Sequence, residues 1–166
     1  MQFVIAAAIA VVTALAEFTV VPYLKIGDAL PHPVLVFGVI CAIVGGIEVG
    51  LTWAFVGGLA LDILGQRPLG SSAFALLVAI AIGSVSGGLL GRVRIVAPVF
   101  ATAVASVVYS MLLLIATTAL TTAPITDAAL GAVIPSAVYD TVLAAVVGPL
   151  VIAVAARRRD ADRVEW

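Results

Sequence analysis

The sequence is poor in charge and in the side chains that carry most enzyme chemistry. Of its 166 residues 10% are charged, and there is one histidine, one cysteine and no asparagine. Soluble domains have about 25% charged and about 45–50% apolar residues, whereas this chain is 64% hydrophobic. A compact soluble fold of this length cannot hide so much apolar surface. The composition argues against a soluble enzyme, a nucleic-acid-binding domain and a disordered chain, and it predicts an integral membrane protein.

The scarce residue types also exclude several kinds of site. One histidine, His32, and one cysteine, Cys41, cannot supply a nitrogen and sulfur metal site or an internal disulfide. Neither glycine-rich nucleotide-binding motif is present, and the net charge of −1 suggests no polyanionic partner. We therefore expect no cofactor, no metal and no nucleic acid. His32 is interpreted as a surface residue in a loop, and Ser71 or Ser72 as the cap of the helix that begins there.

Long apolar runs predict an all-α fold. They cover residues 2–21, 34–46, 50–64, 71–90, 95–119 and 132–156. A spanning helix needs about 20 residues, so the runs predict a six-helix bundle in which the second and third segments are short. Residues 1–156 would form a single transmembrane helical domain, and 157–166 a short basic cytoplasmic tail. The first run lacks a basic segment and a cleavage site, which predicts a retained helix rather than a signal peptide.

Basic residues near helix ends favour the cytoplasm, and they set the expected orientation. The C-terminus is expected in the cytoplasm because it carries Arg157, Arg158, Arg159 and Arg163. The link before the fifth helix is expected on the same side because it carries Arg92 and Arg94. Six spans put the N-terminus there too and leave Lys25 and Arg67 outside. Five spans, with the second and third runs merged, agree slightly better with the charges. We prefer six, because a merged helix would be about 46 Å long and would bury Glu48.

Four acidic residues lie in or near the apolar runs: Glu17, Glu48, Asp62 and Asp140. A charge at the bilayer centre costs about 2.5–3.5 kcal/mol on insertion scales. Glu17 and Glu48 are near run ends or turns, and snorkelling towards water explains them. For Asp62 an interhelical hydrogen bond is favoured over a chemical role. For Asp140, the deepest of the four, a proton relay, a ligand contact and a structural hydrogen bond all stay open.

Small residues recur at every fourth position in several helices. The stripes are Gly83, Gly87 and Gly91 in the fourth run, Gly46 with Gly50, and Ala54 with Gly58. Such a stripe lets another helix backbone approach closely. We expect this packing to lie mainly inside the chain, although the pattern does not specify whose helix is the neighbour.

Short motifs follow one another in a characteristic order. They are Pro31-His32-Pro33-Val34-Leu35-Val36, Gly57-Gly58-Leu59-Ala60-Leu61-Asp62, Pro68-Leu69-Gly70, and Pro135-Ser136-Ala137-Val138-Tyr139-Asp140 with Pro149 before a basic tail. This order resembles the bacterial rod-shape-determining protein MreD family, most specifically from Asp62 to Gly70. Two positions depart from the family, which often has Asp or Asn in place of His32 and usually Asn in place of Asp140.

The resemblance implies a non-catalytic scaffold of the cell-elongation complex in the bacterial cytoplasmic (inner) membrane. Such proteins bind MreC, a single-pass partner, and through it communicate with MreB filaments, the RodA glycosyltransferase and its penicillin-binding transpeptidase. They thereby help to regulate peptidoglycan synthesis and cell shape. The resemblance also implies a fold similar to the six-helix substrate-binding subunits of energy-coupling-factor transporters. The expected packing or partner residues are Gly57, Gly58, Asp62, Pro68, Gly70, Gly83, Gly87, Gly91 and Asp140.

Two other functions stay open. A substrate-binding membrane subunit of a vitamin-type transporter would line a pocket with the short segments and Asp140, although a tight solute site needs several convergent polar groups. An intramembrane aspartyl hydrolase would need the carboxylates of Asp62 and Asp140 side by side.

Overall fold

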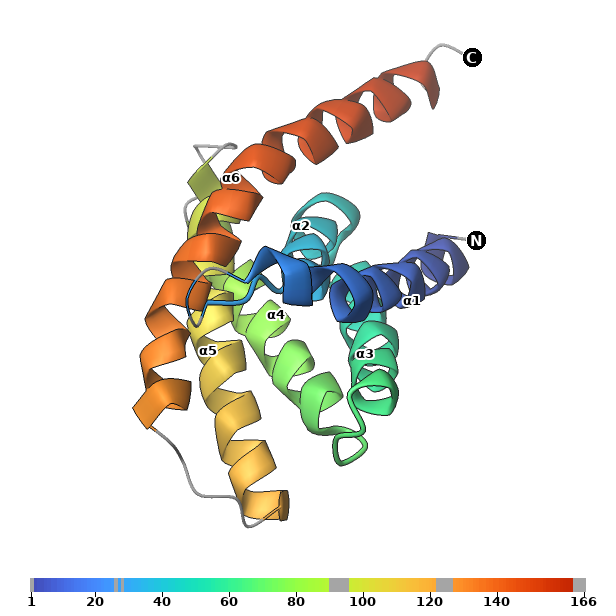
Figure 1. Cartoon of the computed structure of the whole chain (residues 1–166). Coiled ribbons are helices and arrows are strands. Elements are labelled where there is room, and N and C mark those ends of the chain that lie inside the picture. Colours follow the sequence, from blue (N-terminus) through green and yellow to red (C-terminus); the bar gives the residue numbers. More distant parts are fainter. Residues whose placement is uncertain (1, 26, 28, 90–95, 122–126, 163–166) are drawn as a thin grey trace.

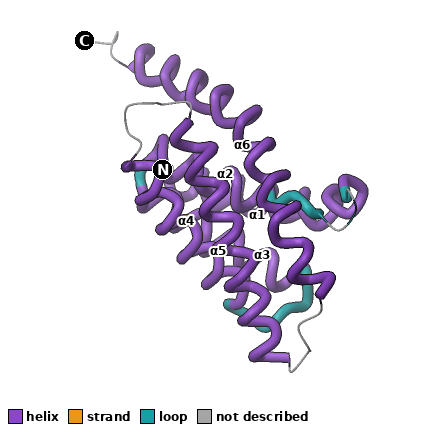
Figure 2. Tube along the Cα trace, turned by 90° about the vertical axis from the view of Figure 1, so that its left-hand side faces the viewer, coloured by secondary structure: helices purple, strands orange, loops and turns teal. Residues whose placement is uncertain are grey.

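The computed structural model describes residues 2–25, 27, 29–89, 96–121 and 127–162. Within these ranges it describes the backbone but not the side chains of residues 89, 121, 127, 128 and 155–162. This part of the chain is all-helical, as predicted (Figures 1 and 2). Its elements are α1 (Gln2–Val20), the 3-10 turn η1 (Val21–Leu24), α2 (Pro33–Gly45), α3 (Ile47–Leu64), α4 (Ser71–Leu89), α5 (Val96–Thr121) and α6 (Asp127–Asp162). The predicted tail 157–166 begins as a continuation of α6, and Arg92, Arg94 and Arg163 lie outside the described residues.

Five of the helices are long and apolar enough to cross a membrane. Among the α-helices of the described residues, α2 is the shortest one, with 13 residues, as the sequence predicts. The prediction that the third segment is also short is wrong. The helix begins at Ile47 and takes in Glu48 and Gly50, so that its 18 residues reach about 27 Å.

The short helix α2 lies at the centre of the bundle. It contacts each of the other five helices, while the long helices form an arc in the order α1, α3, α4, α5, α6, each touching the next. Within the described residues the two ends of this arc, α1 and α6, make no contact with each other. The side chains of Val34, Leu35, Val36, Val39 and Ile40 on α2 are fully buried. Because α2 packs against protein rather than lipid, it does not need the length of a spanning helix.

A tight antiparallel hairpin joins α2 to α3. The turn is Gly46, whose φ of +96° is a conformation that L side chains rarely adopt. A Cβ atom on Gly50 would lie 2.4 Å from the Cβ of Ala42, so the two backbones are in close contact. The hairpin also shows that the merged helix of the five-span alternative does not form.

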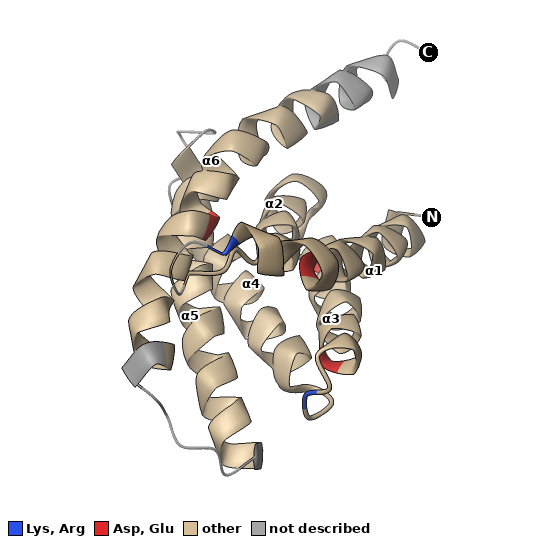
Figure 3. Cartoon of the chain, in the orientation of Figure 1, with Lys and Arg blue, Asp and Glu red and all other residues tan. Residues whose placement is uncertain are grey.

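The outer surface of the arc is apolar. Helix α6 presents a stripe in which every fourth side chain is more than half exposed: Ile134, Val138, Val142, Val146, Leu150 and Val154. Helix α1 turns Ala6, Ala10 and Ala14 towards the bundle and exposes large aliphatic side chains on its other faces. Charged side chains are few among the spanning helices (Figure 3). An apolar surface of this extent fits lipid rather than water, which agrees with a multi-pass membrane protein.

The glycine stripe of α4 packs inside the chain, as expected. A Cβ atom on Gly83 would lie 2.9 Å from the carbonyl oxygen of Ala101 and from the Cβ of Ala105. One on Gly87 would lie 3.1 Å from the Cβ of Ala101. These glycines therefore bring α4 and α5 together and are covered by α5. Gly91 lies outside the described residues.

Gly57 and Gly58 on α3 pack against two different helices. A Cβ atom on Gly57 would lie 2.8 Å from Cγ1 of Val34 on α2. One on Gly58 would lie 2.3 Å from the Cα atom of Ala73 on α4. Both glycines are buried, so they allow α3 to pack closely against α2 and α4.

The crossing of α3 and α4 gives a first prediction. Gly58→Ala is expected to destabilise the fold by about 1–3 kcal/mol, because the added methyl group meets the backbone of Ala73. The matched control is Gly88→Ala in α4, where nothing lies within 4 Å of the added atom, and where alanine is expected to stabilise the helix by about 0.5–1 kcal/mol. Thermal unfolding in detergent measures both variants. Equal melting temperatures would contradict the close crossing.

Candidate functional site

The carboxylate of Asp62 binds the start of α4. Asp62 lies in the last turn of α3 and is fully buried. Its Oδ2 accepts a hydrogen bond from the backbone N–H of Gly70 (2.8 Å), and its Oδ1 accepts one from the N–H of Ser72 (2.9 Å). The first N–H groups of a helix have no partner within the helix, and a negative charge is favourable there. Asp62 is therefore the N-terminal cap of α4, and the predicted interhelical hydrogen bond is confirmed.

The segment between the two helices is shaped around this cap. Gly70 has a φ of +94°, which favours glycine. The hydroxyl of Ser71 lies 2.8 Å from the carbonyl oxygen of Pro68 and 3.0 Å from Oδ1 of Asp62, so its single proton is shared between them. The N–H of Arg67 donates to the carbonyl oxygen of Asp62 (3.0 Å). The prediction that Ser71 or Ser72 caps α4 is thus wrong, because both hydroxyl groups have other partners and the N–H of Ser72 is bound by Asp62.

A second buried carboxylate, Asp140, connects three parts of the chain. Its Oδ1 accepts a hydrogen bond from the backbone N–H of His32 (2.6 Å), and its Oδ2 lies 2.9 Å from Nδ1 of the same residue. The hydroxyl of Ser106 on α5 donates to Oδ2. The side chain of His32 is only 18% exposed, so the interpretation of His32 as a surface residue is wrong. Of the three roles considered for Asp140 from the sequence, the structural hydrogen bond is the one that the structure contains.

The loop before α2 and the first two residues of this helix enter the bundle, and we call these residues, 29–34, the re-entrant segment. Asp140 lies near the middle of the spanning part of α6, so its partner His32 is deep in the bundle. Ser136, one turn earlier on α6, accepts a hydrogen bond from the N–H of Leu30 (3.1 Å). Glu17 on α1 accepts one from the N–H of Val34 (2.8 Å). Glu17 therefore binds the start of α2, and its interpretation as a snorkelling residue is wrong.

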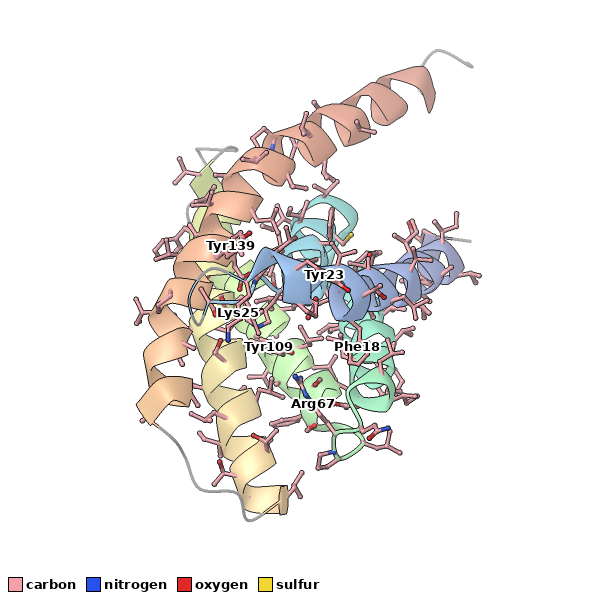
Figure 4. The ribbon with its side chains drawn as sticks, in the orientation of Figure 1. Phe18, Tyr23, Lys25, Arg67, Tyr109 and Tyr139 are labelled. Atoms are coloured by element: carbon pink, nitrogen blue, oxygen red, sulfur yellow. The ribbon has the colours of Figure 1, made fainter. Side chains whose placement is uncertain are left out.

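Aromatic side chains enclose this cluster. The ring of His32 packs edge-to-face against Tyr109, with centroids 5.2 Å apart and planes at 72°. Tyr109 projects from α5 into the bundle and is buried (Figure 4). The side chain of Arg67 reaches from the α3–α4 turn and donates to the hydroxyl of Ser72 (3.3 Å). Trp53 on α3 donates from its indole N–H to the carbonyl oxygen of Val34 (2.9 Å). Sequence reasoning did not single out Ser106, Tyr109 or Trp53 as parts of one site.

The two aspartates do not form a catalytic pair. Asp62 binds residues of the α3–α4 turn and Asp140 binds residues of the re-entrant segment and α5, with no partner in common. In the described part of the chain, α3 and α6 make no contact. Two carboxylates can share a proton only when they lie about 3 Å apart. The dyad that an aspartyl hydrolase would need is therefore absent for these two residues.

An apolar groove of about 380 Å³ runs between α1 and α3. It is lined by Val11, Leu15, Val56, Leu59, Ala60, Ile63 and Leu64. None of these side chains can bind a polar solute by hydrogen bonds. Among the described residues, no group of three His, Cys, Asp or Glu side chains is placed to hold a metal ion.

Comparisons of the chain with family models, with curated proteins and with solved structures find no significant match. The sequence motifs and the geometry of the two carboxylate clusters therefore carry the functional proposal. In both clusters the carboxylate oxygens accept hydrogen bonds from backbone N–H groups and serine. Such an arrangement fixes helices in position.

Proposed function

We propose that the chain is a non-catalytic scaffold subunit of the bacterial cell-elongation complex, similar to MreD. The strongest support comes from the structure of residues 62–70, the most specific part of the resemblance. Asp62 and Gly70 are hydrogen bonded to each other, and together with Pro68 they build the connection between α3 and α4. These residues hold a helix pair in a fixed geometry, which is what a scaffold requires.

The use of the other intramembrane carboxylates also favours a scaffold. Burying an ionisable side chain inside a membrane protein costs free energy, so such a residue is by default a candidate for a functional role. Here Glu17, Asp62 and Asp140 each bind backbone N–H groups that would otherwise be unpaired. The alternative of a vitamin-type transporter subunit needs convergent polar groups facing a pocket, and the α1–α3 groove is aliphatic. As part of the MreD-like proposal, we also propose that the fold is similar to that of energy-coupling-factor substrate-binding subunits.

The proposed partner is an MreC-like single-pass membrane protein. MreB filaments, RodA and its penicillin-binding transpeptidase would be reached through it, from a cytoplasmic membrane with the C-terminus of this chain in the cytoplasm. Gly57, Gly58, Gly83 and Gly87 are covered by neighbouring helices, so they do not offer a docking surface. A partner helix would instead meet the exposed side chains of the arc, such as the α6 stripe.

Photo-crosslinking in the source bacterium tests the proposal. A crosslinking amino acid is placed at Val142 or Val146 in the α6 stripe, and for comparison at Phe55 on α3 or Val85 on α4, all more than half exposed. The expected result is a crosslink to one single-pass, MreC-like protein from one of these faces, and rounded cells when the chain is depleted. The proposal fails if no such protein is captured at any position and depletion leaves the cell shape unchanged.

A further inference from the structure

The re-entrant segment joins the two ends of the helical arc. Helices α1 and α6 do not touch each other in the described part of the chain, yet both are hydrogen bonded to this segment. Glu17 of α1 binds the N–H of Val34, and Asp140 and Ser136 of α6 bind the N–H groups of His32 and Leu30. The segment therefore fastens α1 and α6 to the start of the central helix.

One of these attachments contains a group that changes charge near neutral pH. Histidine has an unperturbed pKa of about 6.5, and Nδ1 of His32 lies 2.9 Å from Oδ2 of Asp140. The protonated ring donates a charge-assisted hydrogen bond, which is roughly twice as strong as a neutral one. The neutral ring can still donate from Nδ1, but without the charge. Protonation therefore changes the strength of this contact without removing its geometry.

We propose that His32 and Asp140 form a pH-responsive latch, which sets how firmly the re-entrant segment is held to α6. Closed, the latch keeps α1 and α6 in a fixed relation across the open side of the arc. Loosened, it lets the segment and the first turn of α2 separate from α6 more often. The latch follows from the fold and does not depend on the proposed function.

Charged and titratable groups surround His32 from several elements. They are Asp140 from α6, Glu17 from α1, Tyr109 from α5 and Arg67 from the α3–α4 turn. Burial on its own would lower the pKa of His32, whereas the charge and the hydrogen bond of Asp140 raise it. Glu17 also raises the pKa and Arg67 lowers it, and the net result is a raised pKa for His32, which lies outside the five spanning segments.

The direction of the pH effect follows from this shift. A group whose pKa is higher in the folded than in the unfolded protein stabilises the fold fully below the unfolded value. That stabilisation is lost as the pH rises through the folded value. We therefore expect the latch to be tightest at mildly acidic pH, where the His32 ring is protonated, and to loosen above neutral pH.

Hydrogen–deuterium exchange of the full chain in lipid nanodiscs tests the latch. Exchange of the peptide covering residues 29–36 is measured between about pH 5.5 and 8.5 and corrected for the intrinsic rate. We expect the protection factor of this peptide to fall about tenfold over this pH range. This is the expected change in the equilibrium constant of the contact when a charge-assisted hydrogen bond is replaced by a neutral one. Peptides from the middle of α5 serve as an internal reference and are expected to keep their protection.

His32→Asn is the matched control variant. The amide nitrogen of asparagine can donate to Oδ2 of Asp140 at every pH in this range, so the contact stays while the titration is lost. Its protection is expected to be independent of pH. The latch is overturned if the wild-type protection is flat, or if His32→Asn shows the same pH dependence. A second measurement needs no variant, because titration of the His32 ring by NMR must give a pKa above that of a free histidine.

Discussion

Asp62→Ala is expected to destabilise the folded protein by about 3–5 kcal/mol. The variant removes the acceptor for the N–H groups of Gly70 and Ser72, and Ser72 is fully buried at the start of α4. Each buried donor left without a partner costs about 1–3 kcal/mol, and the favourable charge at the helix N-terminus is lost as well.

Two further variants separate the cap from a general effect of charge. Asp62→Asn keeps one acceptor oxygen but presents an N–H₂ group to the other amide, so we expect an intermediate loss of about 1–3 kcal/mol. Glu48→Ala removes an exposed acidic residue from the first turn of α3, where the helix dipole contributes about 0.3–1 kcal/mol. Denaturant unfolding in detergent micelles ranks the three variants. If Asp62→Ala is as mild as Glu48→Ala, Asp62 is not the cap of α4.

Local patterns were sufficient to predict several helices. The sequence predicts a helix over 71–90, and the structure has Ser71–Leu89. The glycine stripe at Gly83 and Gly87 is explained as predicted, by close packing within the chain. The length of an apolar run and the prolines and glycines that bound it are local properties, so they can be read without knowing the tertiary structure.

The errors arise where a tertiary partner changes the meaning of a polar residue. Hydropathy treats Glu48 as a break between two runs, although an acidic residue is favourable in the first turn of a helix. His32, between two prolines, is typical of an exposed loop, yet its partner Asp140 lies 108 positions away in the chain. Glu17 is seventeen residues from the N–H group that it binds. No local pattern specifies such pairs.

Asp140→Leu is the second substitution with a large expected effect, and two opposing energies act on it. Leucine favours insertion of α6 into the bilayer, since an aspartate at the helix centre costs about 2.5–3.5 kcal/mol on insertion scales. In the folded bundle, however, leucine leaves the N–H and ring of His32 and the hydroxyl of Ser106 without their partner. Removing one member of a buried charged network costs about 3–5 kcal/mol. We therefore expect normal insertion but a markedly less stable fold.

Two measurements on the same variant separate these energies. Glycosylation mapping of α6 reports insertion, which should be at least as efficient as in the wild type. Thermal unfolding in detergent reports the bundle, which should melt well below the wild type. Val138→Leu is the control on the same helix, because its side chain is 58% exposed on the α6 stripe and should change neither quantity. If Asp140→Leu melts like Val138→Leu, Asp140 does not hold the re-entrant segment.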